Sequence, residues 1–205
     1  MCLHMSQLKK TYAKGLALLL FGASTAYGQQ GDYLSNGYLN AYVDPSGMLF
    51  NSPENEGFSN FPQTGNKRTL YNAHPWFAGQ TQGNPWQLAG DTYKQQGRDF
   101  DFGPISNSRN STYNSRYNRV WVVDQATINS HILNFRLPSY IMPEAIAQWP
   151  AHGDTSNGEA FLLAPFVDVN NNDIYEPEEG DYPQIRGTQA LLFICNEVST
   201  NHGQS

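Results

Sequence analysis

Cysteine is almost absent from this chain, which has only Cys2 and Cys195 among 205 residues. Cys2 lies in an N-terminal segment with the features of a cleaved signal peptide, so the mature chain would keep Cys195 alone and could form no internal disulfide bond. Cys195 follows the apolar residues 190–194, a setting more typical of a small buried hydrophobic residue than of a nucleophile. An exported domain without disulfides needs another source of stability, and a bound metal ion is one.

Charge is also scarce, and positive charge is scarcer than negative charge. The chain has 12 Lys and Arg against 18 Asp and Glu, a net charge of −6. This balance argues against binding to nucleic acid or to anionic membranes. No Lys or Arg occurs between Arg136 and Arg186, whereas six Asp and Glu lie within 168–181. Such a cluster repels itself, and a bound divalent cation would remove that repulsion.

No apolar run is long enough to span a bilayer, which requires about 20 residues. The first 28 residues instead combine a basic start, a short apolar run and two small residues: Lys9, Lys10 and Lys14, then 15–21, then Ala26 and Gly28. This order predicts a secretory signal peptide over residues 1–28 and a single β-rich extracellular domain over 29–205. We therefore expect a protein that is secreted or held at the outer cell surface, with no transmembrane segment.

Residues 168–179, with the sequence Asp-Val-Asn-Asn-Asn-Asp-Ile-Tyr-Glu-Pro-Glu-Glu, have the ligand spacing of a calcium loop. Oxygen-bearing side chains stand at positions 1, 3, 5, 9 and 12 of this loop. Because calcium takes about six to eight oxygen ligands, such alternation suits it. The predicted Ca²⁺ ligands are Asp168, Asn170, Asn172, the carbonyl of Ile174, Glu176 (through water) and Glu179.

The loop departs from the EF-hand pattern at two points. Asp173 stands at position 6, where Gly usually provides the positive φ of the turn, although Asp tolerates that region better than most residues. The flanks are not helical, because 161–167 has the pattern of a strand and Pro177 and Pro183 interrupt the segment that follows. We expect a single calcium loop over 168–181 between strands. The alternative is a polar turn that binds no metal.

The remaining pattern predicts a mainly β fold, an antiparallel β-sandwich-like domain with long loops and one or two short helices. Residues 44–47 (Asp-Pro-Ser-Gly) predict a type I turn. Asp124 is expected to cap a helix with Ile128, Ile132 and Leu133 on one side, and Pro143 to begin a second helix. The predicted strands are 38–43, 48–50, 76–77, 86–89, 120–123, 161–167 and 189–198; the predicted long loops are 51–68 and 97–119.

The apolar strand 189–198 is expected to pair on both sides, as a central strand does. Because the sequence ends seven residues later, we expect a chain truncated at its C-terminus, with the next strands missing. The alternative is an edge strand covered by a loop.

Several short segments together resemble a family. They are 39–43, 47–50, 75–79, 92–93, 99–104, 119–121, 143–144, 149–154, 164–170, 180–183, 187 and 189–190. In order and spacing, over 36–198, they are similar to the N-terminal region of large secreted proteins of Bacteroidota. Those proteins end in a type IX secretion sorting domain or a gliding-motility-associated C-terminal domain. The resemblance implies export and surface placement rather than an activity. The family loop has Gly where Asp173 stands, and no sorting domain occurs here.

Two further patterns bear on chemistry. Asp99 and Asp101 would share one face of a strand, at a separation that suits a glycosidase. The candidate sugar-stacking residues are Trp76, Trp86 and Tyr93. The alternative places most aromatic residues in the core and leaves both Asp residues solvated or capping turns.

The tripeptide His152-Gly153-Asp154 pairs an imidazole with a carboxylate, but no nucleophile motif accompanies it, so a turn is expected.

From the calcium loop and the signal peptide we predict a calcium-stabilised structural or adhesive module, with surface glycans or other surface proteins as partners. The alternative is a carbohydrate-binding module or glycoside hydrolase that uses the Asp99/Asp101 region and exposed aromatic residues.

Overall fold

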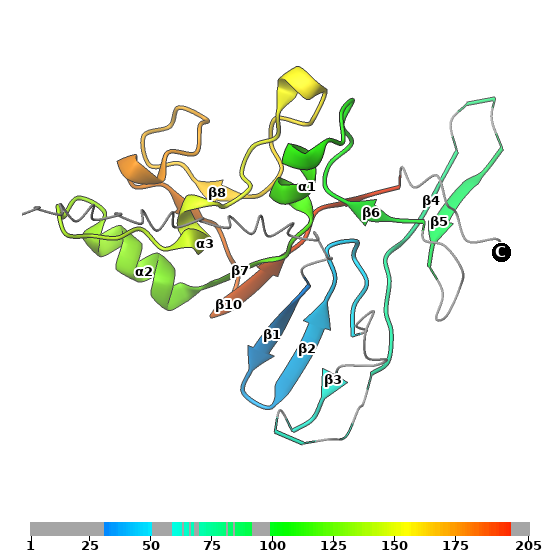
Figure 1. The fold of residues 1–205 in the computed structure, drawn as a ribbon, viewed down its shortest axis with the longest axis horizontal. Coiled ribbons are helices and arrows are strands. Elements are labelled where there is room, and N and C mark those ends of the chain that lie inside the picture. The colour runs from blue at the N-terminus through cyan, green and yellow to red at the C-terminus, as the bar shows by residue number, and fades with distance from the viewer. Residues whose placement is uncertain are drawn as a thin grey trace, which may run out of the picture.

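The structure is a computed structural model, and it describes residues 31–50, 59–62, 64–65, 67, 70–80, 82–83, 85–91 and 99–197. The predicted signal peptide over 1–28 and the candidate stacking residue Tyr93 lie outside these residues. Antiparallel pairing joins the strands of every sheet, and the helices are few and short, so the chain belongs to the mainly β class (Figure 1).

The elements follow one another in the order β1 (Asp32–Asn36), β2 (Leu39–Val43), β3 (Ser59–Asn60), β4 (Trp76–Gly79), β5 (Gln87–Gly90), β6 (Asp101–Phe102), α1 (Ser111–Tyr117), β7 (Trp121–Asp124), α2 (Gln125–Asn134), α3 (Glu144–Ala147), η1 (Thr155–Asn157), β8 (Phe166–Val167), η2 (Pro177–Glu179), β9 (Tyr182–Pro183), β10 (Gln189–Leu192) and β11 (Cys195–Asn196).

The N-terminal sheet has the order β1-β2-β3. Strand β1, which the sequence did not predict, forms a two-residue hairpin with β2 because Asn36 pairs with Leu39. The predicted turn at 44–47 is confirmed: the N–H of Gly47 donates to the carbonyl of Asp44 at 3.0 Å. The predicted return strand at 48–50 is reduced to isolated bridges at Leu49, which pairs with Val43 and with Ala73.

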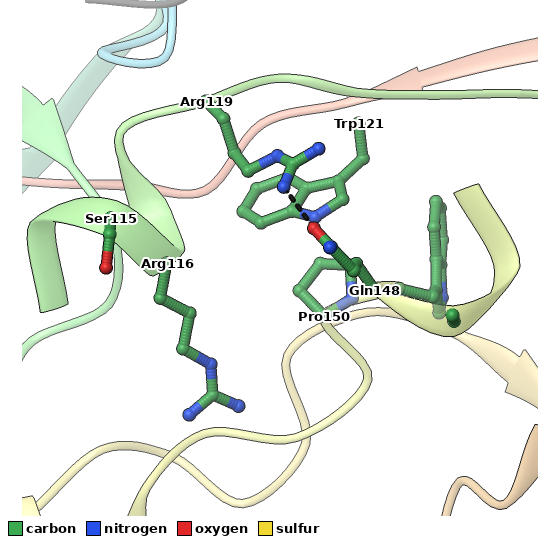
Figure 2. Close-up of a pocket in the computed structure, with 8 residues that line it drawn as sticks. Ser115, Arg116, Arg119, Trp121, Gln148 and Pro150 are labelled. Atoms are coloured by element: carbon green, nitrogen blue, oxygen red, sulfur yellow. Dashed lines mark hydrogen bonds between the residues drawn. The ribbon is translucent and has the colours of Figure 1, made fainter. Parts of the chain in front are cut away.

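One hydrophobic cluster joins β7 to α1, α2, α3 and the segment around β8. Its buried members are Tyr113, Tyr117, Trp121, Val123, Ile128, Ile146, Trp149, Ala151 and Ala164. Strand β7 alternates as its period of two requires, with Trp121 and Val123 buried between half-buried neighbours. Beside this core, Arg119 reaches from the end of α1 to Gln148 at the end of α3 and borders a pocket (Figure 2).

Helix α1 lies within 97–119, which was predicted to be a loop, so that prediction was wrong for seven residues. Asn110 caps the helix, because its side chain accepts the N–H of Tyr113 at 3.0 Å. Tyr113 and Tyr117 stand four residues apart on one face and pack their rings 4.9 Å apart in the core. This aromatic pair fixes the helix in a segment whose other residues are mostly polar.

Helix α2 begins as predicted, since the Asp124 carboxylate accepts the N–H of Thr127 at 2.6 Å. Its buried face is different from the prediction: Ile128 and His131 are buried, whereas Ile132 and Leu133 are exposed. Helix α3 is also confirmed, although Pro143 is its N-cap rather than its first residue.

The predicted strand 189–198 is divided into β10 and β11 by Phe193 and Ile194. Strand β10 pairs with β7, and β11 pairs with β6. The prediction that this strand pairs on both sides is not met within the described residues, where β10 has β7 as its hydrogen-bonded neighbour. The predicted strand 161–167 is also shorter, because only Phe166 and Val167 form β8.

Candidate functional site

The predicted calcium loop connects the antiparallel strands β8 and β9. Phe166 pairs with Pro183 and Val167 pairs with Tyr182, so the two ends of the loop are held side by side. The residues that the sequence assigned to calcium therefore lie in one short loop between these strands (orange in Figure 1).

Asp168 organises the first half of this loop. Its Oδ1 accepts the N–H of Asn171 and its Oδ2 accepts the N–H of Asp173, both at 2.7 Å. Burial raises the pKa of Asp168, but hydrogen bonds from the loop amides, that of Asp173 foremost, outweigh burial and lower the pKa below its usual value. Asp173 has φ 62°, so the left-handed turn predicted at position 6 is present although no glycine stands there.

Asn170, Asn172 and Glu176 form one side-chain network. The Asn172 and Asn170 amide groups donate to Oε2 of Glu176, at 2.5 Å and 3.4 Å, and Oδ1 of Asn172 accepts the N–H of Ile174. The structure thus brings together Asp168 and these three residues along one loop. Glu179, in η2, is exposed, and its side chain takes no part in the network that the described loop residues form.

Asp181 is the most buried carboxylate of the acidic cluster, and the sequence did not assign it a role. Its side chain is 0% exposed; Oδ1 accepts the N–H of Val169 and Oδ2 accepts the N–H of Glu176, both at 2.8 Å. One carboxylate therefore connects the start of the loop, at Val169, to the residue just before η2. One feature of the sequence could have indicated this role: Asp181 is the last acid of the cluster and directly follows Gly180.

His131 connects Asp181 to helix α2. The carbonyl of Asp181 can only accept, so Nε2 of His131 carries a proton and donates to it at 3.0 Å. The other ring nitrogen, Nδ1, then accepts the O–H of Tyr140 at 3.1 Å. Burial lowers the pKa of His131, which keeps the ring neutral near pH 7.

His152 holds the loop from its other side. Its Nε2 accepts the N–H of Tyr175 at 2.9 Å, so Nδ1 carries the proton and donates to the carbonyl of Phe161 at 3.1 Å. The ring also stacks on Phe161, with centroids 4.3 Å apart. The neighbouring Asp154 carboxylate caps η1 through Ser156 instead of approaching the imidazole. These contacts give the His152-Gly153-Asp154 tripeptide a structural role.

The oxygen donors of the loop suit a hard cation. Asp168 is ionised at neutral pH, and each carboxylate oxygen keeps a lone pair beyond the one that a loop amide occupies. Asn170 and Asn172 turn their NH₂ groups towards Glu176, so both amides would have to rotate to present oxygen to a metal. Within the described ranges no group of three or more His, Cys, Asp or Glu could hold a metal, and the predicted set relies on amide and carbonyl oxygens as well.

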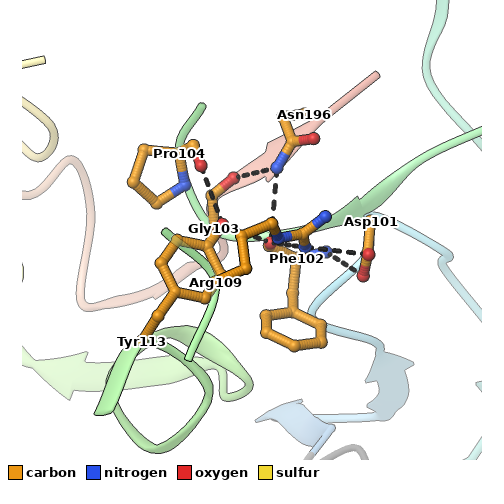
Figure 3. A network of polar contacts seen from close by, with 7 residues as sticks. All are labelled: Asp101, Phe102, Gly103, Pro104, Arg109, Tyr113 and Asn196. Atoms are coloured by element: carbon orange, nitrogen blue, oxygen red, sulfur yellow. Dashed lines mark hydrogen bonds and ion pairs between the residues drawn. The ribbon is translucent and has the colours of Figure 1, made fainter. Parts of the chain in front are cut away.

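The two carboxylates of the alternative hypothesis have separate structural partners. Asp99 is buried, and its Oδ2 accepts the N–H of Gly90 at 2.9 Å. Oδ2 of Asp101 forms an ion pair with Arg109 at 2.8 Å (Figure 3). Arg109 and Asn196 also donate to the carbonyl of Phe102, which places Asp101 in a network that joins β6, β11 and the segment before α1.

Cys195 lies at the β11 end of this region and is a partly buried thiol. Burial raises its pKa to about 11, so the thiol is protonated and a poor nucleophile at neutral pH. This agrees with its predicted role as a small hydrophobic residue.

Two of the three candidate stacking residues, Trp76 and Trp86, lie on the β4–β5 hairpin. Trp76 and Trp86 are 59% and 73% exposed, unlike Trp121 and Trp149, which are in the core. The indole of Trp76 covers Gly90, its partner across the hairpin, where a Cβ atom would lie 2.8 Å from the ring. Leu88, which pairs with Ala78 on the same side of the hairpin, is 62% exposed, so this side carries an apolar surface.

No family model, curated protein or solved structure matches this chain. Its resemblance to secreted Bacteroidota proteins therefore stays a prediction from the sequence. Over the residues that the structure describes, no helix has the length and apolar character needed to cross a membrane.

Proposed function

We propose that this chain is a calcium-stabilised structural or adhesive module of a protein that is secreted or held at the outer cell surface. The observation that carries the proposal is the loop between β8 and β9. There Asp168 has a lowered pKa, and Asn170, Asn172 and Glu176 stand beside one another at calcium-loop spacing. The predicted signal peptide over 1–28 is the support for export.

Calcium would act on stability through the way the loop is mounted. Six acids lie within 168–181, and a divalent cation would offset their mutual repulsion. His131 and His152 bind the loop's main chain from two sides of the core. A more rigid loop would therefore also stabilise α2 and the segment around His152.

We also propose that the antiparallel sheets pack as a β-sandwich. Support comes from β1, which lies beside both β7 and β10 although it belongs to another sheet (Figure 1). A sandwich presents loops at its ends, which suits a module that contacts surface glycans or other surface proteins.

Titration calorimetry with calcium tests the metal site directly. Wild-type protein should bind one calcium ion, and Asp168→Asn and Glu179→Gln should each weaken binding about tenfold or more, since each removes a charged ligand. Glu178→Gln is the matched control, because it removes an exposed charge of the same segment that is outside the predicted ligand set. Equal weakening in all three variants would mean that calcium is attracted by the total charge of the cluster and not by a specific set of ligands.

A carbohydrate-binding function is the second candidate, and the exposure of Trp76 and Trp86 favours it. Indole rings are common stacking surfaces for sugars, whereas Asp99 and Asp101 are each committed to other partners, so binding has more support than hydrolysis. Glycan-array screening should show binding that Trp86→Ala abolishes. Silence over a broad panel, with the protein folded, would eliminate this candidate.

A further inference from the structure

A second candidate site lies on the surface between α1 and α3, away from the calcium loop. It is a pocket of about 290 Å³, lined by Ser115, Arg116, Arg119, Trp121, Ala147, Gln148, Trp149 and Pro150. Arg116 extends from α1 and Arg119 from the turn behind it, whereas Gln148 and Pro150 lie opposite (Figure 2). Ligand pockets span about 300 to 1,000 Å³, so an occupant of this one must be small.

The lining is positively charged although the chain as a whole is acidic. Two of the eight lining residues are arginines and none is an acid. Trp121 and Trp149, two of the other lining residues, are buried in the core and give the pocket an apolar indole floor. Charges that face low-dielectric walls interact more strongly with a ligand than charges in open solvent.

Arg116 has unused hydrogen-bonding capacity. One terminal nitrogen donates to the carbonyl of His152 at 2.7 Å, and the guanidinium lies 5.1 Å from the ring centroid of Tyr117. Both partners are neutral, and none of the ion pairs between described residues includes Arg116. Because a guanidinium has five N–H donors, most of those on Arg116 remain available to a ligand.

Arg119 is held in place beside it. Its guanidinium lies over Trp121, donates to Gln148, and forms an ion pair with Glu144 at 3.2 Å. The Glu144 side chain is 65% exposed, so this ion pair contributes little and can be exchanged. The buried Nε of Arg119 has no hydrogen-bond partner among the described protein atoms.

We propose that this pocket binds a small ligand through an oxyanion group, a carboxylate, sulfate or phosphate, recognised by Arg116 and Arg119. Planar guanidinium groups match oxyanions with paired hydrogen bonds, which a lysine cannot reproduce. Gln148 and the indole floor would contact the uncharged part of the ligand. None of the residues that line this pocket is a predicted calcium ligand, so its failure would leave the loop proposal intact.

The test is a binding titration of the purified chain, followed by NMR or calorimetry, with sulfate, phosphate, glucuronate and neutral glucose. Binding of at least one oxyanion, without binding of glucose, is expected, and it should weaken as salt is added. Arg116→Gln should weaken binding about tenfold or more, the effect of one charge-assisted hydrogen bond. Arg119→Lys should also weaken it, because the charge is kept and the planar fork is lost.

Two control variants separate a site from general attraction. Arg136→Gln removes an exposed arginine that stacks on Phe135 outside the pocket, and it should leave affinity unchanged. Glu144→Gln should tighten binding by about two- to fivefold, because it frees Arg119 from its exposed ion pair. Lack of binding by all three anions in the folded protein, or equal weakening by Arg136→Gln and Arg116→Gln, would overturn the proposal.

Discussion

Nε2 of His131 lies 3.0 Å from the main-chain oxygen of Asp181, so helix α2 and the end of the acidic loop meet in one hydrogen bond. Both residues are 0% exposed. The carboxylate of Asp181 continues the connection by accepting main-chain N–H groups of Val169 and Glu176. The loop is therefore anchored to the core through two residues that are not among its predicted calcium ligands.

This anchor predicts that Asp181→Ala destabilises the fold with or without calcium. The substitution leaves two partly buried N–H groups without their acceptors, and a buried group in this state costs about 1–3 kcal/mol. We expect the free energy of unfolding in urea to fall by about 2–4 kcal/mol, and by less in Asp181→Asn, which keeps one acceptor. Asp173→Asn, an exposed neighbour whose positive φ suits Asn, should change it by less than about 0.5 kcal/mol. Equal effects at both positions would contradict the anchoring role.

The burial of His131 predicts a loss of stability in mild acid. Burial lowers the pKa of His131 in the folded state, so the unfolded chain, whose His pKa is about 6.5, takes up the proton first as pH falls. Stability from this residue is complete above about pH 7 and decreases below about pH 6.5. The slope can reach about 1.4 kcal/mol per pH unit. Urea unfolding between pH 7.5 and pH 5 should show this slope in wild-type protein and a smaller one in His131→Gln. Identical slopes in wild-type protein and His131→Gln would contradict this role of His131.

A pair of glycine substitutions separates backbone strain from close packing. Gly103 and Gly187 have nearly the same positive φ, 83° and 85°, so alanine is similarly strained at both. A Cβ at Gly103 would collide with the Tyr113 hydroxyl, whereas nothing lies within 4 Å of one at Gly187. Gly187→Ala should cost about 1–2 kcal/mol, and Gly103→Ala about 1–3 kcal/mol more. Equal losses in a denaturant titration would show that Tyr113 can move aside.

The predictable parts of this fold are those whose cause is local in the sequence. Asp124 caps α2 three residues from the N–H that it accepts, and the turn at 44–47 closes on itself. The left-handed conformation of Asp173 followed from loop spacing in the same way. Each of these depends on neighbours within a few positions, which a single sequence displays.

The parts that were missed depend on distant contacts. Helix α1 has few apolar residues, and it forms because Tyr113 and Tyr117 enter a core built from β7 and α3. The burial of His131 in place of Leu133 depends on Asp181, 50 residues further along the chain. The separate partners of Asp99 and Asp101, Gly90 and Arg109, are also contacts that sequence spacing does not reveal.

Thermal unfolding in calcium and in chelator tests the central claim most directly. With calcium at about a hundred times its dissociation constant, binding should add about 2.7 kcal/mol and raise the midpoint by about 5–10 °C. With calcium binding about tenfold weaker or worse, the shift in Asp168→Asn should fall to about half or less, and it should persist in Glu178→Gln. If the protein is folded in both conditions and the two midpoints coincide, the loop at 168–179 is an ordinary turn and the account of calcium stabilisation is wrong.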